Sequence, residues 1–354
     1  MRIAVLGAGN GGFGVAADLA HRGHKVRLYE FPTFADNLKA IRETKEIKLR
    51  GVTGEGCARL ETVTTDMEVA LAGADLAIAV VPAYGQRALA AVCAPYLRPE
   101  QPLVLSPGYV GGALEFKQIL AAHGCQEATV AETSAFPFAC RKEGDDAVWI
   151  RGIKKGILLA AGNHAQSMAV VQQLDELWPG SFTAASSILE SSLNEINPVI
   201  HPPLMICNLG LFEESGVPFK LFTQGVSPGT ARLMEALDEE RMAILRHLKL
   251  PVRSTKDWLI HFYQDQGVYG DDLYEVLKYS PVHKAALSPT SLNHRYFTED
   301  VSFGLVPLAA IATQAGVDVP TIKGCIRLAS AIAGQDLAVS GRELSGLINE
   351  EMFR

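Results

Sequence analysis

The chain begins MRIAVLGAGNGGFGV over residues 1–15, and this stretch decides the fold. Residues 3–6 form a short apolar run that ends at a glycine, which is typical of a buried parallel strand. Helical periodicity follows from about Gly11 to His21, and Gly23 fits the position just after a helix. A strand, a glycine-rich turn and a helix in this order predict the first part of a βαβ unit.

The same alternation continues through the first half of the chain. Strand-like runs, separated by helix-like segments, occur at residues 25–30, 75–81, 103–105 and 128–131. Residues 138–160 have the character of further strands, and residues 163–177 that of a closing helix. Alternating strands and helices imply right-handed crossovers and a doubly wound parallel sheet.

The second half has a different texture. Long helical segments are predicted at residues 187–209, 230–248, 302–315 and 320–334, with few strand-like alternations between them. The predicted fold class is therefore α/β: an N-terminal Rossmann domain with a doubly wound parallel sheet, followed by an all-helical C-terminal domain. We expect the first domain over residues 1–183 and the second over residues 184–354, with the change near the turn at residues 179–181.

Composition limits the classes of partner. The 354 residues are 48% hydrophobic and carry a net charge of −7, which disfavours a nucleic acid because its phosphates need a basic face. Six cysteines lie far apart without metal-ligand spacing, so free thiols and no bound metal are expected. No leader-like segment precedes the first strand, and no apolar run is long enough to span a bilayer. We expect a cytoplasmic protein that binds small molecules and no membrane.

The glycine-rich turn predicts a dinucleotide site. Residues 7–12 read GAGNGG and fit the G-x-G-x-x-G pattern between a strand and a helix. The first glycine permits the tight turn, the second lets a pyrophosphate approach the backbone, and the third allows close helix–strand packing. The helix N-terminus then offers N–H groups to the phosphates. The expected cofactor-binding residues of this turn are Gly7, Gly9, Asn10, Gly11 and Gly12.

Glu30 stands at the end of the second predicted strand, where this pattern needs an acidic residue. Its carboxylate can accept hydrogen bonds from the adenine ribose of NAD, but it would repel the 2′-phosphate of NADP. Phe31, Pro32 and Thr33 follow, so no Arg or Lys comes next to reverse that preference. The sequence predicts NAD as cofactor.

Two further strand ends carry candidate cofactor contacts. Pro82 follows the strand at residues 75–81, and Ser106 follows the strand at residues 103–105. Ligands in open α/β sheets bind beyond the carboxyl ends of the strands. We therefore expect Pro82 and Ser106 to line the ribose and nicotinamide side of the site, although ordinary strand-to-helix turns explain them equally well.

A proline-rich stretch marks the helical half. Residues 193–203 read LNEINPVIHPP, in which Asn194, Asn197 and His201 recur at helical spacing beside an apolar stripe. We expect Pro198 to bend this helix, because it removes a backbone hydrogen bond. The hypothesis is that the bend presents the Asn/His stripe to the cleft between the domains. The alternative is an ordinary solvated helix face.

Several segments together resemble the opine dehydrogenases. They are GAGNGG and the segments at residues 105–116, 132–141, 196–202 and 292–308, which cover nearly the whole chain. This family includes the octopine and nopaline dehydrogenases and the bacterial N-(1-carboxyethyl)-amino-acid dehydrogenases. The resemblance implies reductive condensation of an α-keto acid, such as pyruvate, with the amine of an amino acid, using NAD(P)H. A homodimer is implied by the same analogy.

The resemblance also implies roles for single residues. His201 matches the family's catalytic histidine, Asp300 matches its partner, and Arg295 matches a position that binds a substrate carboxylate. We expect Asn194 and Asn197 to bind substrate beside them. A histidine suits this chemistry because it can take a proton from the ammonium group and return one to the departing water near neutral pH.

Other readings remain open. Asp300 could simply cap the helix that follows, and Arg295 could be a surface ion-pair partner. Phe13 departs from the polar residue that several relatives carry after the glycine turn. An NAD-dependent 2-keto-acid reductase (a 2-hydroxy-acid dehydrogenase) would use the same histidine without an amine, and a non-catalytic NAD-binding regulator would need the cofactor site alone.

Overall fold

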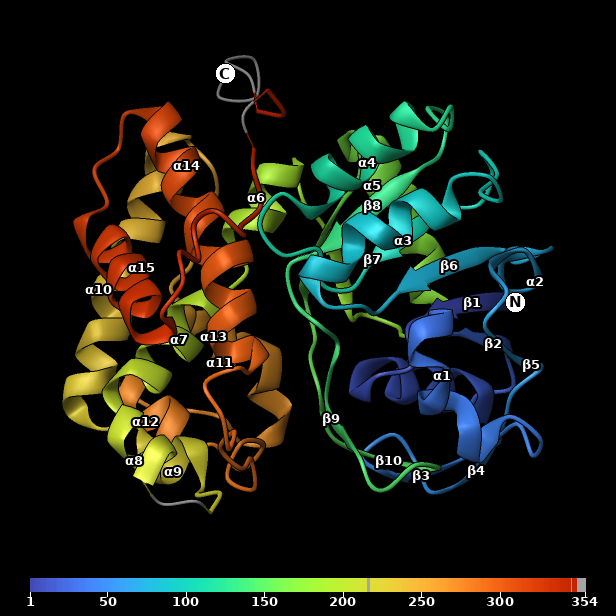
Figure 1. The fold of residues 1–354 in the computed structure, drawn as a ribbon, viewed down its shortest axis with the longest axis horizontal. Coiled ribbons are helices and arrows are strands. Elements are labelled where there is room, and N and C mark those ends of the chain that lie inside the picture. The colour runs from blue at the N-terminus through green and yellow to red at the C-terminus, as the bar shows by residue number, and fades with distance from the viewer. Residues whose placement is uncertain (215–216, 345, 349–354) are drawn as a thin grey trace. The chain divides into compact units, whose positions relative to one another are not determined.

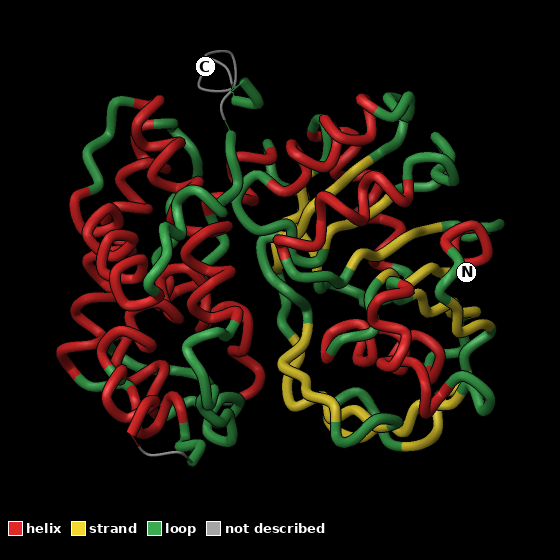
Figure 2. Tube along the Cα trace, viewed as in Figure 1, coloured by secondary structure: helices red, strands yellow, loops and turns green. Residues whose placement is uncertain are grey.

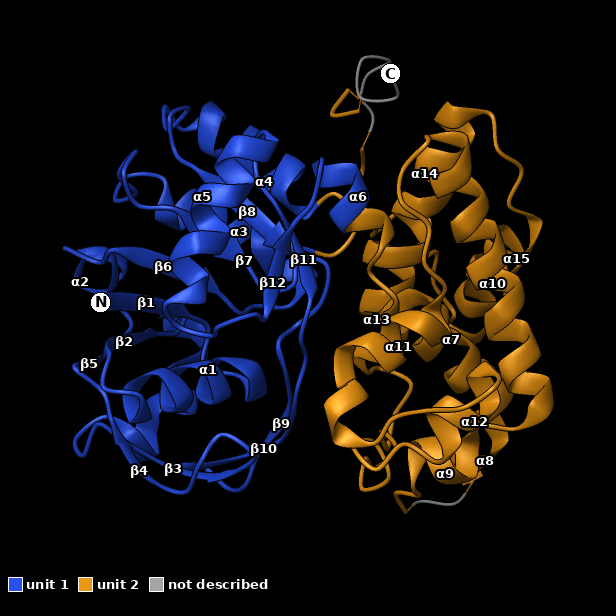
Figure 3. Cartoon of the chain, turned by 180° about the vertical axis from the view of Figure 1, so that it is seen from behind, with its two compact units in different colours: residues 1–108, 112–191 blue, residues 109–111, 192–354 orange. Residues whose placement is uncertain are grey.

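The computed structural model describes residues 1–214, 217–344 and 346–348 (Figure 1). Contacts within the chain divide it into two compact units, coloured separately in Figure 3. Unit 1 comprises residues 1–108 and 112–191, and unit 2 comprises residues 109–111 and 192–354. The main change of unit therefore falls between Ser191 and Ser192, a little after the boundary expected from the texture of the sequence.

Unit 1 contains the expected Rossmann sheet. Its eight strands lie in the order β12 (Phe182–Ala184), β11 (Ile157–Ala160), β8 (Val130–Thr133), β7 (Leu103–Leu105), β6 (Leu76–Ala79), β1 (Arg2–Leu6), β2 (Lys25–Tyr29) and β5 (Thr62–Thr64). Every neighbouring pair is parallel except β11 with β8. The chain runs from β1 to β2 on one side and later to β6 on the other, which places the switch of direction at β1. The doubly wound parallel sheet is confirmed.

Helices connect these strands, as Figure 2 shows by colour. They are α1 (Asn10–His21), η1 (Pro32–Ile41), α2 (Met67–Leu71), η2 (Ala83–Gly85), α3 (Gln86–Cys93), α4 (Gly112–Ala122), α5 (His164–Asp175) and, at the end of the unit, α6 (Ile188–Leu193). The strands β6, β7 and β8 are fully buried along their length. Their continuous apolar runs arise because parallel strands are covered on both faces.

A second sheet was not expected from the sequence. Its four strands lie in the order β4 (Gly56–Arg59), β3 (Glu46–Gly51), β10 (Ala147–Ile153) and β9 (Phe138–Lys142). The strands predicted within residues 138–160 exist, but β9 and β10 belong to this sheet rather than to the Rossmann sheet. Helix α1 packs against β4, β9 and β10. The second sheet thus forms a wall beside the glycine-rich turn.

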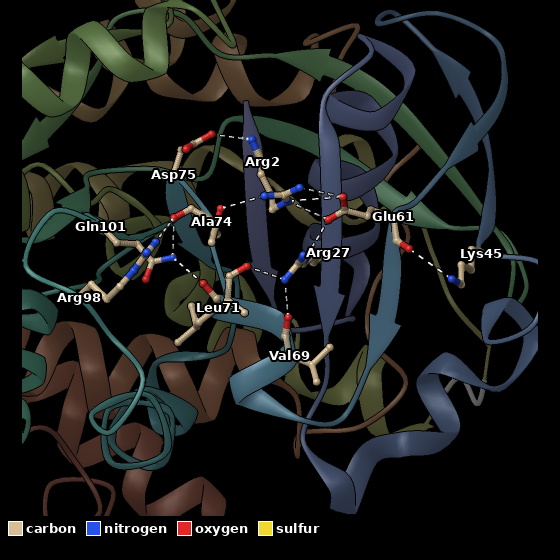
Figure 4. Close-up of polar contacts among 12 residues, drawn as sticks. Arg2, Arg27, Lys45, Glu61, Val69, Leu71, Ala74, Asp75, Arg98 and Gln101 are labelled. Carbon is tan, nitrogen blue, oxygen red and sulfur yellow. Dashed lines mark hydrogen bonds and ion pairs between the residues drawn. The ribbon is translucent and has the colours of Figure 1, made fainter.

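A polar cluster ties the Rossmann strands together away from that turn (Figure 4). Arg2 Nε and Arg27 Nε both donate to Glu61, at 3.1 and 2.6 Å. Arg27 Nη1 also donates to the carbonyls of Val69 and Ala72, and the Arg2 amide donates to Asp75 at 2.7 Å. The hydrogen bond from Arg27 lowers the pKa of Glu61. This cluster joins β1, β2, the residue that precedes β5 and the end of α2.

Unit 2 is helical. Its helices are α7 (Asn197–Cys207), α8 (Leu209–Glu214), α9 (Leu221–Gly225), α10 (Pro228–His247), α11 (Thr255–Tyr263), η3 (Gln264–Gln266), α12 (Leu273–Lys278), α13 (Arg295–Asp300), the π-helical turn η4 (Val301–Leu305), α14 (Val306–Ala315) and α15 (Pro320–Ala333). The helices predicted at residues 230–248 and 320–334 are confirmed as α10 and α15, and the segment predicted at 302–315 consists of the π-helical turn η4 followed by α14. Among the described residues, no helix is both long and apolar enough to cross a membrane.

The prediction of one long helix at residues 187–209 is wrong, because two separate helices, α6 and α7, lie in this segment. Helix α6 ends at Leu193 and α7 begins at Asn197, with Pro198 in its first turn. Glu195 Oε1 accepts a hydrogen bond from the Asn197 amide at 3.0 Å, which supports the start of α7. Pro198 therefore does not bend a continuous helix. It begins a new one, where its missing N–H costs nothing.

Candidate active site

The glycine-rich turn has the shape that a dinucleotide needs. A Cβ at Gly7 would lie 2.5 Å from Val80 O, and one at Gly12 would lie 1.7 Å from Gly7 O, so the fold itself requires both glycines. Gly7 also has φ +112°, which side chains other than glycine rarely adopt. No atom lies within 4 Å of a Cβ at Gly9. Gly9 thus leaves open space where a pyrophosphate can approach the backbone, and NAD fits this cradle.

The start of α1 supports this reading. Gly9 is its N-cap and provides no side-chain hydrogen bond to the first turn, which suits an anion at the helix N-terminus. Asn10 Oδ1 accepts a hydrogen bond from the Lys142 amide at 2.8 Å, which fastens β9 to the turn. A Cβ at Gly11 would lie 2.7 Å from Val80 Cγ1. Asn10 and Gly11 therefore shape the turn, and their direct contact with cofactor stays a prediction.

Glu30 is anchored beside the turn. Its side chain is buried, and Oε2 accepts hydrogen bonds from the Ala8 amide at 3.1 Å and from Asn37 Nδ2 at 3.0 Å. Oε1 accepts from the Phe31 amide at 2.9 Å. A carboxylate offers about four acceptor positions, so capacity remains for a ribose hydroxyl. Glu30 is thus held beside the glycine-rich turn, and its contact with the adenine ribose of NAD stays a prediction.

The sequence analysis did not predict that a lysine, Lys142, lies near Glu30. A cavity of about 730 Å³ is lined by Asp36, Asn37, Lys39, Ala40, Lys142 and Asp145. Lys142 Nζ lies 3.7 Å from the centre of the Phe13 ring, and burial lowers the pKa of this lysine. Phe13, the departure noted in the sequence, is a buried partner for that ammonium group. Neighbours of Glu30 in the chain could not reveal Lys142, because β9 brings it from far along the sequence.

Pro82 and Ser106 lie at the carboxyl ends of β6 and β7. Pro82 comes directly before η2, and the Ser106 amide donates to Ala79 O at 2.9 Å. The Ser106 side chain is buried and lies 3.4 Å from Thr133 Oγ1. Both residues therefore sit at the strand edge where ligands of such sheets bind. Their contact with cofactor stays a prediction.

His201 and Asp300 form a buried pair in unit 2. His201 Nδ1 lies 2.9 Å from Asp300 Oδ2, although α7 and α13 bring them from positions 99 residues apart. Asp300 is fully buried and His201 is 9% exposed. Asp300 makes no side-chain capping bond to the following turn, so the alternative that it serves only as a helix cap is wrong. An ionised carboxylate can only accept, so this contact suits the imidazole tautomer that carries its proton on Nδ1.

Arg295 lies one turn before Asp300 on α13. Its Nε is 3.0 Å from Glu299 Oε2, and its Nη2 donates to Tyr109 Oη at 3.2 Å. Tyr109 belongs to unit 2 by its contacts and has φ +59°. Burial, with Asp300 and Glu299 nearby, raises the pKa of Tyr109 well above its usual value, so it remains a neutral phenol. Arg295 does form an ion pair, but with a fully buried carboxylate, and its own side chain is 47% exposed.

The two asparagines do not share one face as expected. Asn194 is buried in the break between α6 and α7, where its Oδ1 accepts from Trp258 Nε1 at 2.8 Å and from Arg241 Nη1 at 3.3 Å. Arg241 also donates to Leu193 O at 2.8 Å, at the end of α6. These contacts give Asn194 a structural role in the break. Asn197 begins α7 one turn before His201. Substrate binding by either residue stays a prediction.

Comparison with known proteins gives the family. The model of the α-helical domain of NAD/NADP octopine/nopaline dehydrogenases matches residues 184–333, and that of the N-terminus of NAD-dependent glycerol-3-phosphate dehydrogenase matches residues 2–117. An opine dehydrogenase of Arthrobacter sp. (strain 1C) is 35% identical over 97% of this chain and 94% of its own. Vitopine synthase of Allorhizobium ampelinum is 27% identical over 98% of this chain and 95% of its own.

A solved structure of octopine dehydrogenase in complex with NADH and agmatine shares the fold, with a TM-score of 0.76 and 23% identity over 98% of this chain and 93% of its own. The 35% identity to a relative along almost the whole chain, with the helical-domain match, then decides the matter. The chain belongs to the opine dehydrogenase family, NAD-dependent oxidoreductases that act on CH–NH groups and reductively condense a keto acid with an amino acid.

Proposed function

We propose that His201 moves the protons of this reaction and that Asp300 orients it. The observation that carries the proposal is the 2.9 Å contact between His201 Nδ1 and Asp300 Oδ2, made by a carboxylate with no exposure to solvent. With the proton held on Nδ1, the neutral ring keeps Nε2 as its basic atom. A buried carboxylate also stabilises the imidazolium form, which is the role that an acidic partner plays in other catalytic pairs.

The reaction divides into three proton and bond changes. His201 Nε2 takes a proton from the ammonium group of the amino acid, and the freed amine attacks the carbonyl carbon of an α-keto acid such as pyruvate. After a proton passes from nitrogen to oxygen within the adduct, the imidazolium returns its proton to the carbinolamine hydroxyl, which leaves as water and gives a protonated imine. Bound NADH supplies the hydride that reduces this imine to the secondary amine of the opine.

Arg295 is proposed to bind the carboxylate of the keto acid. Its guanidinium is half exposed and is held by Glu299 and Tyr109, which fix its plane without using all five of its donors. Asn197, one turn before His201, is the asparagine better placed to assist, since the Oδ1 of Asn194 already serves Trp258 and Arg241. Gly9 and Glu30 would bind NAD, with Pro82 and Ser106 toward its nicotinamide side.

Two broader properties are also proposed. A cytoplasmic location is supported by six free cysteines, which suit a reducing compartment. A homodimer is supported only by analogy with relatives. A mass measurement in solution that finds monomer alone would discard the dimer.

The deciding experiment is a panel of keto acids and amino acids, each alone and in pairs, scored by oxidation of NADH. We expect turnover to require both partners. Equal turnover of a keto acid without any amine would instead identify a 2-keto-acid reductase. Turnover of any pair by the purified chain removes the non-catalytic NAD-binding regulator. Running the same panel with NADPH tests the cofactor preference assigned to Glu30.

A further inference from the structure

The imidazole of His201 is held on its face as well as at its edge. The ring of Tyr296 stacks on it, with centroids 3.9 Å apart and planes inclined by 24°. Tyr296 lies on α13, which also carries Asp300. Asp300 contacts an edge atom of the imidazole, so one short helix fixes the ring in two different directions. The sequence did not single out Tyr296, which lies outside the helices predicted from it.

Tyr296 also contacts a second histidine ring. The ring of His294 meets it edge to face, with centroids 4.5 Å apart and planes inclined by 74°. His294 is the N-cap of α13, and its Nδ1 accepts a hydrogen bond from the Tyr296 amide at 3.2 Å. The stacked tyrosine is therefore held by the cap of its own helix, and its orientation does not depend on His201 alone.

We propose that Tyr296 is a positioning residue for the reaction: its ring fixes the plane of the His201 imidazole and favours the protonated form. An aromatic face carries partial negative charge and attracts a cation that lies over it. An imidazolium stacked on Tyr296 gains this attraction, whereas the neutral ring gains little. The proposal rests on the proton-transfer role of His201 for its functional meaning, but the stacking and its effect on protonation can be measured separately.

Other charged groups also face this part of unit 2. On α13, Asp300 contacts the imidazole edge directly, while Glu299 and Arg295 form a pair of opposite charges. Tyr109 is neutral and Glu195 lies near it. On α10, which packs against α7, Asp238 and Arg241 are paired with each other at 2.8 Å. The paired charges oppose each other, whereas Asp300 and the face of Tyr296 contact the imidazole ring itself.

The test is a series of substitutions that changes the ring stacked on the face of the His201 imidazole and leaves Asp300 at its edge unchanged. Tyr296→Phe keeps an aromatic ring, Tyr296→Leu removes it, and Tyr296→Trp provides a more attractive one. The readout is the pH titration of the His201 imidazole by NMR, with His201→Asn identifying its resonance by its loss. Tyr269→Leu is the matched control, because Tyr269 is a 78% exposed tyrosine of the same unit.

We expect the titration midpoint of His201 to move toward acid by about one pH unit in Tyr296→Leu, to stay nearly unchanged in Tyr296→Phe and to move toward base in Tyr296→Trp. The acid limb of kcat/KM should move with it. An unchanged midpoint in Tyr296→Leu, or an equal shift in Tyr296→Phe, would overturn the proposal. If Tyr296→Leu fails to fold, the opposite shift expected of Tyr296→Trp still decides.

This result is independent of the proposed function. Normal turnover by His201→Asn would remove the proton-transfer role of His201, yet the NMR series would still report whether Tyr296 acts on its ring. Conversely, inactive His201→Asn with a flat NMR series would leave the proton-transfer role in place and remove the role of Tyr296.

Discussion

At the scale of single residues, the His201–Asp300 pair makes the sharpest prediction. His201→Asn should lower kcat by on the order of 10²–10⁴, the usual contribution of a positioned acid–base group. Asp300→Asn should lose a comparable factor, because the ring loses the partner that holds its proton on Nδ1. The double variant should lose far less than the product of both factors, since residues that act as one unit are not additive. Steady-state kinetics on the three variants measures this.

A purely structural pair would give the opposite pattern. Melting temperatures would then fall while turnover per folded molecule stayed close to that of the wild type. NADH affinity provides the control, because the glycine turn and Glu30 belong to unit 1 and are untouched by these changes. Near-normal turnover in His201→Asn would end the assignment.

At the scale of elements, the π-helical turn η4 sets the spacing between the helices that carry the pair. A Cβ at Gly304 would lie 2.3 Å from Pro198 Cγ, so η4 and α7 approach as closely as a glycine allows. Asp300 immediately precedes η4, and His201 follows Pro198 by one turn of α7. Pro198 therefore packs against Gly304, whereas the sequence analysis predicted only that it would bend a helix.

Gly304→Ala should consequently disturb both stability and catalysis. Overpacking at this contact should cost about 1–3 kcal/mol, and the displaced helix should lengthen the His201–Asp300 contact and lower kcat. Gly324→Ala is the matched control, since Gly324 lies in α15 with no atom within 4 Å of an added Cβ. There we expect unchanged kcat and equal or greater stability, by up to about 1 kcal/mol. Urea unfolding and kinetics on both variants test the difference, and equal behaviour of the two would contradict it.

The polar cluster of Arg2, Arg27 and Glu61 leads to a prediction about how the stability of unit 1 depends on pH. Its pKa is lowered in the folded protein, chiefly by the hydrogen bond from Arg27, so the ionised form stabilises the fold. This contribution is complete above the ordinary glutamate pKa and is lost as pH falls through the lowered value. Glu61→Gln should therefore be less stable than wild type at neutral pH, with a gap that narrows in acid. Urea midpoints at several pH values measure the gap.

Glu127→Gln serves as the control for that series, because Glu127 is an exposed carboxylate of the same unit. Its urea midpoint should track that of the wild type at every pH. A gap for Glu61→Gln that stays constant into acid would show that lost packing, rather than lost charge, causes the destabilisation.

At the scale of the whole molecule, local patterns in the sequence predicted local structure and left out distant pairings. The strands at residues 3–6 and 103–105 are found because buried parallel strands are continuously apolar. The second sheet was missed because β3 pairs with β10, and the contact of Lys48 with Asp146 there spans 98 positions. Periodicity carries no information about such a pairing.

The candidate site follows the same division. The glycine turn and Glu30 were predictable because they lie in one βαβ unit, whose spacing is set by local geometry. His201 and Asp300 came from family resemblance, and only the fold brings them into contact. Tyr109 had no signal at all: its left-handed backbone and its membership of unit 2 depend on tertiary contacts. Asn194 had the right spacing for a site and is instead part of a buried network with Trp258.

The two-unit organisation allows cofactor binding to be separated from catalysis in one thermal experiment. Saturating NADH should raise the melting temperature of the wild type. At a hundredfold excess over Kd, its binding adds about 2.7 kcal/mol to the free energy of unfolding. Gly9→Val should leave the melting of the free protein nearly unchanged, since a Cβ there meets no atom within 4 Å and its φ of −73° suits any residue. The added side chain should nevertheless abolish the NADH-induced shift, because it occupies the space of the pyrophosphate. His201→Asn should show the full shift although its kcat is strongly reduced. A Gly9→Val protein that NADH still stabilises as strongly as the wild type would mean that the cofactor does not lie across this turn.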